Sequence, residues 1–134
     1  MSLEEDGLHV DFSVRSCIES AKHALIGKLQ AITKLAGGTY TVAGDYPGWQ
    51  YRVDSPLRDK MVKLYREMYG REPKVEAIHA GLECGLLGSK IDNLDCVSFG
   101  PDMKDIHTTE ETLSISSTKR VWEYLVRLLE EKDV

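Results

Sequence analysis

Two loops hold most of the residues whose chemistry could build a functional site. The first covers residues 78–85, which read IHAGLECG and include His79 and Glu83. The second begins at Gly100, runs through His107 and ends at an acidic pair. Both loops follow predicted strands, and in an α/β protein such loops converge on one edge of the sheet. Imidazole and carboxylate groups placed there can bind a metal ion or transfer a proton.

His107 has two interpretations from the residues alone. It is either a solvated loop histidine or a metal ligand or general base presented from the end of a strand. A zinc site needs three or four ligands, and no second histidine or carboxylate stands at a recognised ligand spacing from His107. One histidine cannot make such a site, so its other ligands would have to come from elsewhere in the fold or from outside this chain.

The loop at residues 78–85 also leaves alternatives open. His79 and Glu83 are four residues apart, a spacing that on a helix puts both on one face and suits a ligand pair or an acid–base pair. Gly81 lies between them and interrupts such a helix, which favours structural roles for both residues. Gly81 and Gly85 allow backbone N–H groups to approach a carboxylate or phosphate closely, although the signal is weak by itself.

Arg15 ends a predicted strand and shares one face of it with Asp11 and Ser13. An arginine in this place is commonly a solvated sheet residue. The alternative is a bidentate clamp on a substrate carboxylate, for which the planar guanidinium fork is suited.

The elements that must position these residues alternate between strand and helix patterns. Alternation of apolar and polar residues predicts a strand over residues 8–14. A helix is predicted over residues 17–35, capped by Ser16 with Glu19 completing a capping box and ended by a glycine pair. A second strand is predicted over residues 39–42. A series of lysines along this helix is interpreted as a solvated helix face: Lys22, Lys28 and Lys34.

The second half continues the alternation. Ser55 is the predicted cap of a helix that has Pro56 in its first turn and stops at Gly70. A helical turn is predicted over residues 81–87, and a final helix starts after a cap at Ser117 or Thr118. Short strands or extended stretches are predicted at three places: residues 75–78, 96–99 and 113–116. The predicted fold class is α/β, and its first part, strand–helix–strand, is typical of half of a ferredoxin-like layer.

Composition excludes several classes of protein. The chain has 134 residues, of which 42% are hydrophobic and 29% charged, typical of a globular domain and not of a disordered chain. The formal net charge of −5 argues against a nucleic-acid partner, because phosphate binding needs a basic face. No apolar run is long enough for a membrane span or a secretory leader. Three cysteines without CxxC spacing favour reduced thiols, and hence a cytoplasmic protein with no membrane partner.

Several motifs, in this order, resemble those of the aminoacyl-histidine dipeptidases. These enzymes are also called Xaa-His dipeptidases or bacterial carnosinases, and they are a branch of the di-zinc metallopeptidase clan. The run at 78–85 is the most specific of the motifs, and the resemblance covers the chain from about residue 8. The matching segments are residues 14–16 (VRS), 45–49 (DYPGW), 78–85 (IHAGLECG), and Gly100 with Pro101 followed by His107 and Glu110-Glu111.

The resemblance implies roles for three residues. His107 matches the family's last metal ligand, Arg15 the lid arginine that holds the C-terminal carboxylate of the dipeptide, and Gly81 a backbone contact to substrate. It assigns no role to His79 or Glu83. The family's remaining metal ligands and general base belong to the N-terminal half of such enzymes, so no catalytic residue is expected in this chain. Two zinc ions per subunit are expected in the whole enzyme, and cobalt or manganese are possible substitutes.

The resemblance also implies how the chain is organised. Residues 1–3 are interpreted as a cloning scar and residues 4–45 as the second half of a lid and dimerisation domain. Residues 46–53 are a predicted linker, and residues 54–134 the C-terminal part of the catalytic domain. The chain is then the C-terminal third of a longer enzyme.

The predicted function is that of a fragment of a zinc dipeptidase that hydrolyses Xaa-His and related dipeptides with a metal-activated water. The fragment alone is expected to be inactive, because it lacks most of the metal ligands and the general base. A homodimer, or self-association through exposed edges, is expected. The alternative is a free-standing α/β binding or interaction module that uses the Gly81 turn for a carboxylate or phosphate.

Overall fold

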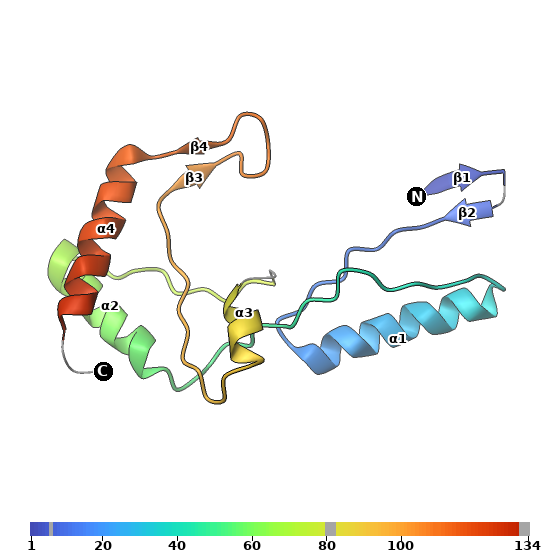
Figure 1. Cartoon of the computed structure of the whole chain (residues 1–134), viewed down its shortest axis with the longest axis horizontal. Helices are drawn as coiled ribbons and strands as arrows, with labels where there is room; N and C mark the ends of the chain where they lie inside the picture. Colours follow the sequence, from blue (N-terminus) through green and yellow to red (C-terminus); the bar gives the residue numbers. More distant parts are fainter. Residues whose placement is uncertain (6, 80–82, 132–134) are drawn as a thin grey trace. The chain divides into compact units, whose positions relative to one another are not determined.

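The computed structural model describes residues 1–5, 7–79 and 83–131 (Figure 1). It is a mixed α/β structure, which confirms the predicted fold class. Its elements, in chain order, are β1 (Ser2–Glu4), β2 (Gly7–His9), α1 (Glu19–Leu35), α2 (Pro56–Tyr69), α3 (Glu83–Gly88), β3 (Met103–Lys104), β4 (Thr112–Leu113) and α4 (Ile115–Glu130).

The strands in the described residues are shorter than the sequence patterns predict, and several lie at other positions. β1 pairs antiparallel with β2, and β3 pairs antiparallel with β4. The strand predicted over residues 8–14 ends at His9, and no strand forms among the described residues at 39–42, 75–78 or 96–99. Those predictions are wrong for a physical reason. An apolar pattern shows which face of a segment prefers burial, but a strand also needs a neighbour to share its hydrogen bonds.

Helix α1 begins differently from the prediction. Ile18 is its N-cap and makes no side-chain capping hydrogen bond. The Ser16 hydroxyl accepts the N–H of Ile18 at 3.1 Å, and the Glu19 carboxylate accepts the N–H of Gly48 at 2.8 Å. The predicted capping box is therefore wrong, because both side chains bind other groups. The glycine at the end of the helix is confirmed, with φ of +76° at Gly37.

Helix α2 agrees with its sequence signals. The Ser55 hydroxyl accepts the N–H of Arg58 at 3.2 Å, and Pro56 stands in the first turn. Gly70 ends the helix with φ of +65°, and its N–H donates to the carbonyl of Arg66 at 2.8 Å. The Asp95 carboxylate strengthens the start of the helix, because it accepts both the Ser55 hydroxyl at 2.7 Å and a backbone N–H at 3.0 Å.

Helix α4 begins earlier than predicted, and α3 lies in the region of its prediction. α3 overlaps the predicted helical turn, although residues 80–82 lie outside the described part of the chain. Helix α4 is capped by Ser114, whose hydroxyl accepts the N–H of Ser117 at 3.3 Å. The predicted cap at Ser117 or Thr118 is therefore wrong. Ser117 is buried in the first turn, where its hydroxyl accepts the N–H of Asp102 at 2.9 Å.

The chain divides into two compact units. The N-terminal unit contains residues 1–51 and 77–90, and the C-terminal unit contains residues 52–76 and 91–134. Residues 77–90 thus group with the first 51 residues, whereas the family resemblance places them with the catalytic segment. The assignment of lid, linker and catalytic parts stays a prediction.

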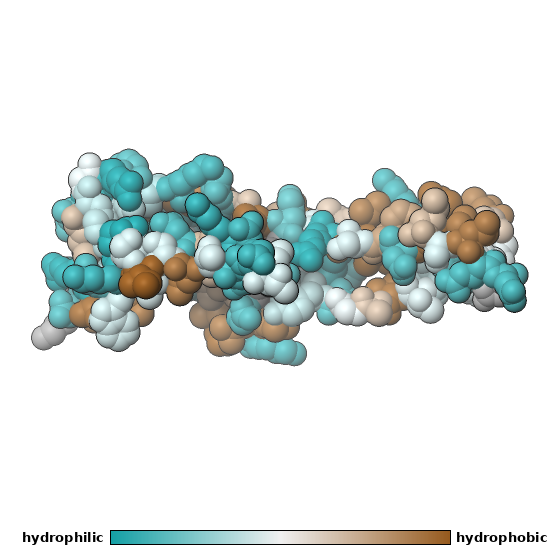
Figure 2. Space-filling model, turned by 90° about the horizontal axis from the view of Figure 1, so that it is seen from above, coloured by the Kyte–Doolittle hydropathy of each residue, from teal (hydrophilic) through white to brown (hydrophobic). Residues whose placement is uncertain are grey.

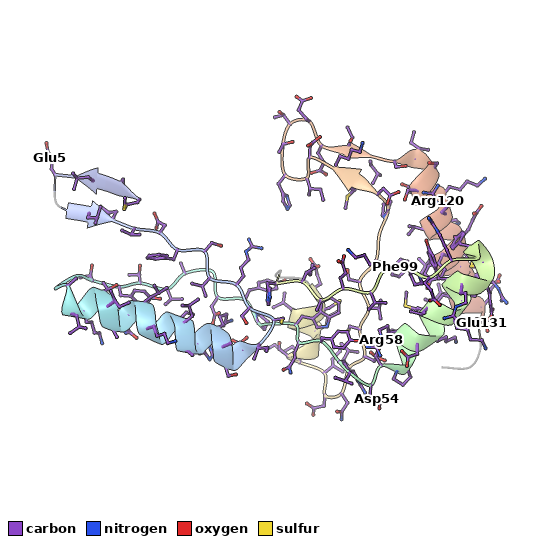
Figure 3. The ribbon with its side chains drawn as sticks, turned by 180° about the vertical axis from the view of Figure 1, so that it is seen from behind. Glu5, Asp54, Arg58, Phe99, Arg120 and Glu131 are labelled. Atoms are coloured by element: carbon purple, nitrogen blue, oxygen red, sulfur yellow. The ribbon has the colours of Figure 1, made fainter. Side chains whose placement is uncertain are left out.

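The core of the C-terminal unit lies between α2 and α4. It consists of Met61 and Leu64 from α2 and Tyr124 from α4, all buried. The Tyr124 hydroxyl donates to the carbonyl of Met61 at 2.6 Å. Phe99, labelled in Figure 3, packs edge-on against the Tyr124 ring with centroids 5.5 Å apart. Burial raises the pKa of Tyr124 to about 12, so the hydroxyl stays a hydrogen-bond donor.

Apolar side chains are also exposed on both units. Ile115, Trp122 and Leu129 of α4 are 87%, 65% and 75% exposed, and brown apolar residues stand among hydrophilic ones on the face drawn in Figure 2. Self-association through such surfaces stays a prediction. No helix in the described part of the chain is long and apolar enough to cross a membrane.

Candidate functional site

The DYPGW segment at residues 45–49 is fastened to the first turns of α1 by a buried lysine. The Lys22 ammonium lies 2.7 Å from an oxygen of Asp45, 2.7 Å from the carbonyl of Tyr46 and 2.7 Å from an oxygen of Glu19. Only 6% of the Lys22 side chain is exposed. The prediction of a solvated face is therefore wrong for Lys22, because three oxygen acceptors replace the water that an ammonium group needs.

The charges of this network stabilise one another. Hydrogen bonds to Asp45 and Glu19 hold the pKa of Lys22 above its usual range, although burial acts in the opposite direction. The hydrogen bond from Lys22 lowers the pKa of both carboxyl groups. All three groups are consequently charged at neutral pH.

Two motif glycines lie where separate segments touch. A Cβ atom at Gly48 would stand 2.9 Å from the carbonyl oxygen of Cys17, and a Cβ atom at Gly85 would stand 2.8 Å from the carbonyl oxygen of Pro47. Any side chain at either position would displace backbone, so the close approach requires glycine. The DYPGW segment is therefore packed between the start of α1 on one side and α3 on the other.

His79 joins the same cluster. Its Nδ1 atom accepts the backbone N–H of Cys17 at 3.1 Å. The three N-terminal motifs, at residues 14–16, 45–49 and 78–85, thus converge on the start of α1 within the N-terminal unit. Sequence reasoning identified the motifs but missed their convergence. The signal that could have found it was the presence of glycine in both motifs, at Gly48 and at Gly85, where a close approach of backbone needs the absence of a side chain.

The three predicted site residues are placed as follows. Arg15 is exposed and lies in the segment between β2 and α1. Gly81 lies outside the described residues. His107 belongs to the C-terminal unit, where it is exposed in the loop between β3 and β4 and has φ of +67°. Its N–H donates to the carboxylate of Glu111 at 2.8 Å, which fixes the turn that carries the imidazole.

The described residues do not form a zinc site around His107. Across residues 1–5, 7–79 and 83–131, one group of three potential metal ligands lies within 4.8 Å, namely Glu19, His23 and Asp45, and His107 is not part of it. The Lys22 ammonium already pairs with both carboxylates of that group, so a cation would have to compete with it for the same oxygens. The role of His107 as a metal ligand stays a prediction, and a single imidazole is too little to hold a zinc ion by itself.

A prediction follows from the Lys22 network. Lys22→Met removes three charge-assisted hydrogen bonds and is expected to lower the free energy of unfolding by about 1–2 kcal/mol at neutral pH. Lys28→Met is the matched control, because Lys28 lies exposed on the same helix and should change stability by less than about 0.5 kcal/mol. Urea denaturation at pH 7 measures both effects.

The same pair of variants also gives a pH test. Carboxyl groups whose pKa is lowered by folding stabilise the folded state above their unfolded pKa, and this stabilisation is lost as the pH falls through the folded pKa. The difference in the free energy of unfolding between wild type and Lys22→Met should therefore shrink below about pH 4, as Glu19 and Asp45 take up protons. A difference that is the same at pH 7 and pH 3 would contradict the ion-pair origin.

Comparison with known proteins relates this chain to dipeptidases. No model of a known protein family matches it. The cytosol non-specific dipeptidase of Escherichia coli (strain K12) is 33% identical to it over 131 residues, which are 98% of this chain and 27% of that enzyme. The crystal structure of aminoacylhistidine dipeptidase from Vibrio alginolyticus matches it with a TM-score of 0.71 and 39% identity, over 86% of this chain and 24% of that one.

The resemblance to aminoacyl-histidine dipeptidases that the motifs predict is thus confirmed. The chain is homologous to parts of two dipeptidases, and it spans about a quarter of the length of each.

Proposed function

We propose that this chain works as part of a metal-dependent dipeptidase, in which Arg15 binds the C-terminal carboxylate of the substrate and His107 contributes one metal ligand. The observation that carries the proposal is the similarity of the chain, along nearly its whole length, to two dipeptidases. The convergence of three motifs of that family on one cluster supports it. The name of the E. coli relative also favours a cytosolic location.

Arg15 is suited to the proposed role by its chemistry and its exposure. A guanidinium offers two parallel N–H donors to a carboxylate, and this bidentate contact fixes direction as well as charge. The Arg15 side chain is open to solvent in the structure, so a small substrate can reach it. Such a contact selects peptides with a free C-terminal carboxylate, and it favours short peptides because the scissile bond lies close to that group.

We propose that zinc is the metal and that the other ligands come from protein outside this chain. Zinc accepts imidazole nitrogen as a ligand and, when fully coordinated, supplies an activated water for peptide hydrolysis. His107 presents its imidazole from a loop whose backbone is held by Glu111 and by the β3–β4 pairing. Because one ligand gives little affinity, residues 1–134 alone are expected neither to retain zinc nor to hydrolyse dipeptides.

Substrate amidation tests the proposed carboxylate recognition. In the complete protein that contains these residues, whatever its length, we expect Xaa-His dipeptides to be cleaved. The corresponding dipeptide amides should have kcat/KM values lower by about tenfold or more, because the charged partner of Arg15 is gone. Equal cleavage of the free dipeptide and its amide would contradict carboxylate recognition. If the protein binds phosphate or a carboxylate but hydrolyses no dipeptide, the result favours the alternative of a binding module.

A further inference from the structure

The segment that carries Arg15 is not held by a strand ladder. β2 ends at His9, and residues 10–18, all of them described in the structure, form no strand. The backbone around Arg15 therefore needs another source of order if its side chain is to meet a carboxylate in a fixed direction. The hydrogen bonds near residue 17 provide that source.

Both backbone polar groups of Cys17, which belong to two successive peptide units, have neighbours from distant segments. Its N–H donates to Nδ1 of His79 at 3.1 Å, across 62 residues of sequence. Its carbonyl oxygen lies against Gly48, where a Cβ atom would stand at 2.9 Å. Cys17 follows Arg15 by two residues, so these contacts restrict the path of the backbone that carries Arg15.

The hydrogen bond also defines the state of the His79 ring. Nδ1 is the acceptor in this contact, so the bond assigns the tautomer in which the proton is on Nε2. Leucine can fill the space of this ring but cannot accept the hydrogen bond. Asparagine can present its side-chain oxygen close to where Nδ1 lies, which makes it the conservative replacement.

We infer that His79 is a positioning residue for Arg15. By accepting the Cys17 N–H, it holds the Arg15 segment in the orientation needed for bidentate contact with the substrate carboxylate. The inference rests on the proposed function of Arg15 and gives His79 a role that neither the motif nor the similarity assigns. A displacement of about 1 Å in such a contact can cost on the order of a hundredfold in rate, so a single backbone hydrogen bond has a measurable effect.

The test uses His79→Leu and His79→Asn in the complete protein, each alone and combined with Arg15→Ala. We expect His79→Leu to raise KM for an Xaa-His dipeptide about tenfold and to change kcat by less than about threefold. His79→Asn should recover most of the wild-type KM. When Arg15→Ala is already present, adding His79→Leu should raise KM for the dipeptide by less than about twofold. In the protein with Arg15 intact, His79→Leu should change KM for the dipeptide amide as little.

A second measurement reads the hydrogen bond directly. Hydrogen exchange of the Cys17 amide, followed by NMR, should be slow in the wild type and in His79→Asn and faster by about tenfold or more in His79→Leu. If His79→Leu does not fold, the exchange rates of the Cys17 amide in the wild type and in His79→Asn still test whether the hydrogen bond exists.

The outcomes separate this inference from the proposed function. A wild type without dipeptidase activity overturns the proposed function, and this inference with it. An active wild type overturns the inference alone in any of three cases: His79→Leu acts additively with Arg15→Ala, His79→Asn is as impaired as His79→Leu, or the Cys17 amide is unprotected in the wild type.

Discussion

His107→Ala is expected to remove one zinc ion per subunit from the complete protein and to lower kcat by more than about a hundredfold. Replacing even the outer partners of a metal ligand costs roughly 10- to 100-fold in affinity or activity, and a direct ligand should cost more. The imidazole is exposed in the loop between β3 and β4, whose turn is fixed by the hydrogen bond from the backbone N–H of His107 to Glu111. Removing the ring therefore deletes the ligand while leaving the turn in place.

The control for this variant is His23→Ala. His23 is an exposed histidine on α1 that lies 3.3 Å from a carboxylate oxygen of Glu19, and no metal role is proposed for it. Metal analysis by mass spectrometry and initial rates with an Xaa-His dipeptide should show normal values for this control. A His107→Ala protein that keeps its full zinc content and activity would contradict the ligand assignment.

Arg15→Ala is expected to lower kcat/KM for dipeptides by about thirty- to a thousandfold. Truncating one partner of a desolvated, hydrogen-bonded charge pair typically costs about 2–4 kcal/mol, which gives this range. Because the carboxylate contact exists in the ground state as well as in the transition state, much of the loss should appear in KM.

Arg15→Lys is the matched variant. Lysine keeps the positive charge but lacks the planar fork, so its loss should be intermediate. Steady-state kinetics with a dipeptide and with its amide measure the effect. The dipeptide amide should be cleaved equally by wild type and Arg15→Ala, and an equal loss for both substrates would show that Arg15 supports the fold and does not bind the carboxylate.

The helices could be predicted from sequence because their signals are local. Ser55, Pro56 and Gly70 define both ends of α2 through side-chain capping and backbone conformation within a few residues. The strands could not be predicted in the same way, because a strand forms only beside a partner strand, and a local sequence pattern does not identify that partner. Lys22 shows the same limit on a helix. It belongs to the same series of lysines on α1 as the exposed Lys28, but Asp45 and Tyr46, more than twenty residues away in sequence, bury it.

The candidate site was predicted in part. Arg15 and His107 were candidates by residue type and position, and the family resemblance gave them roles that stay predictions; both side chains are exposed in the structure. The cluster at the start of α1 was not predicted, because the bonds that build it join Cys17 to His79 and Glu19 to Gly48 across long stretches of sequence. Only the glycines gave a local hint of close approach.

The most direct test of the account is to measure zinc content and hydrolysis of β-alanyl-histidine for the complete protein and for residues 1–134 alone. We predict two zinc ions per subunit and cleavage in the complete protein, and neither in residues 1–134. Stoichiometric zinc and hydrolysis by the 134 residues themselves would contradict the account, because a full set of ligands would then have to lie within this chain.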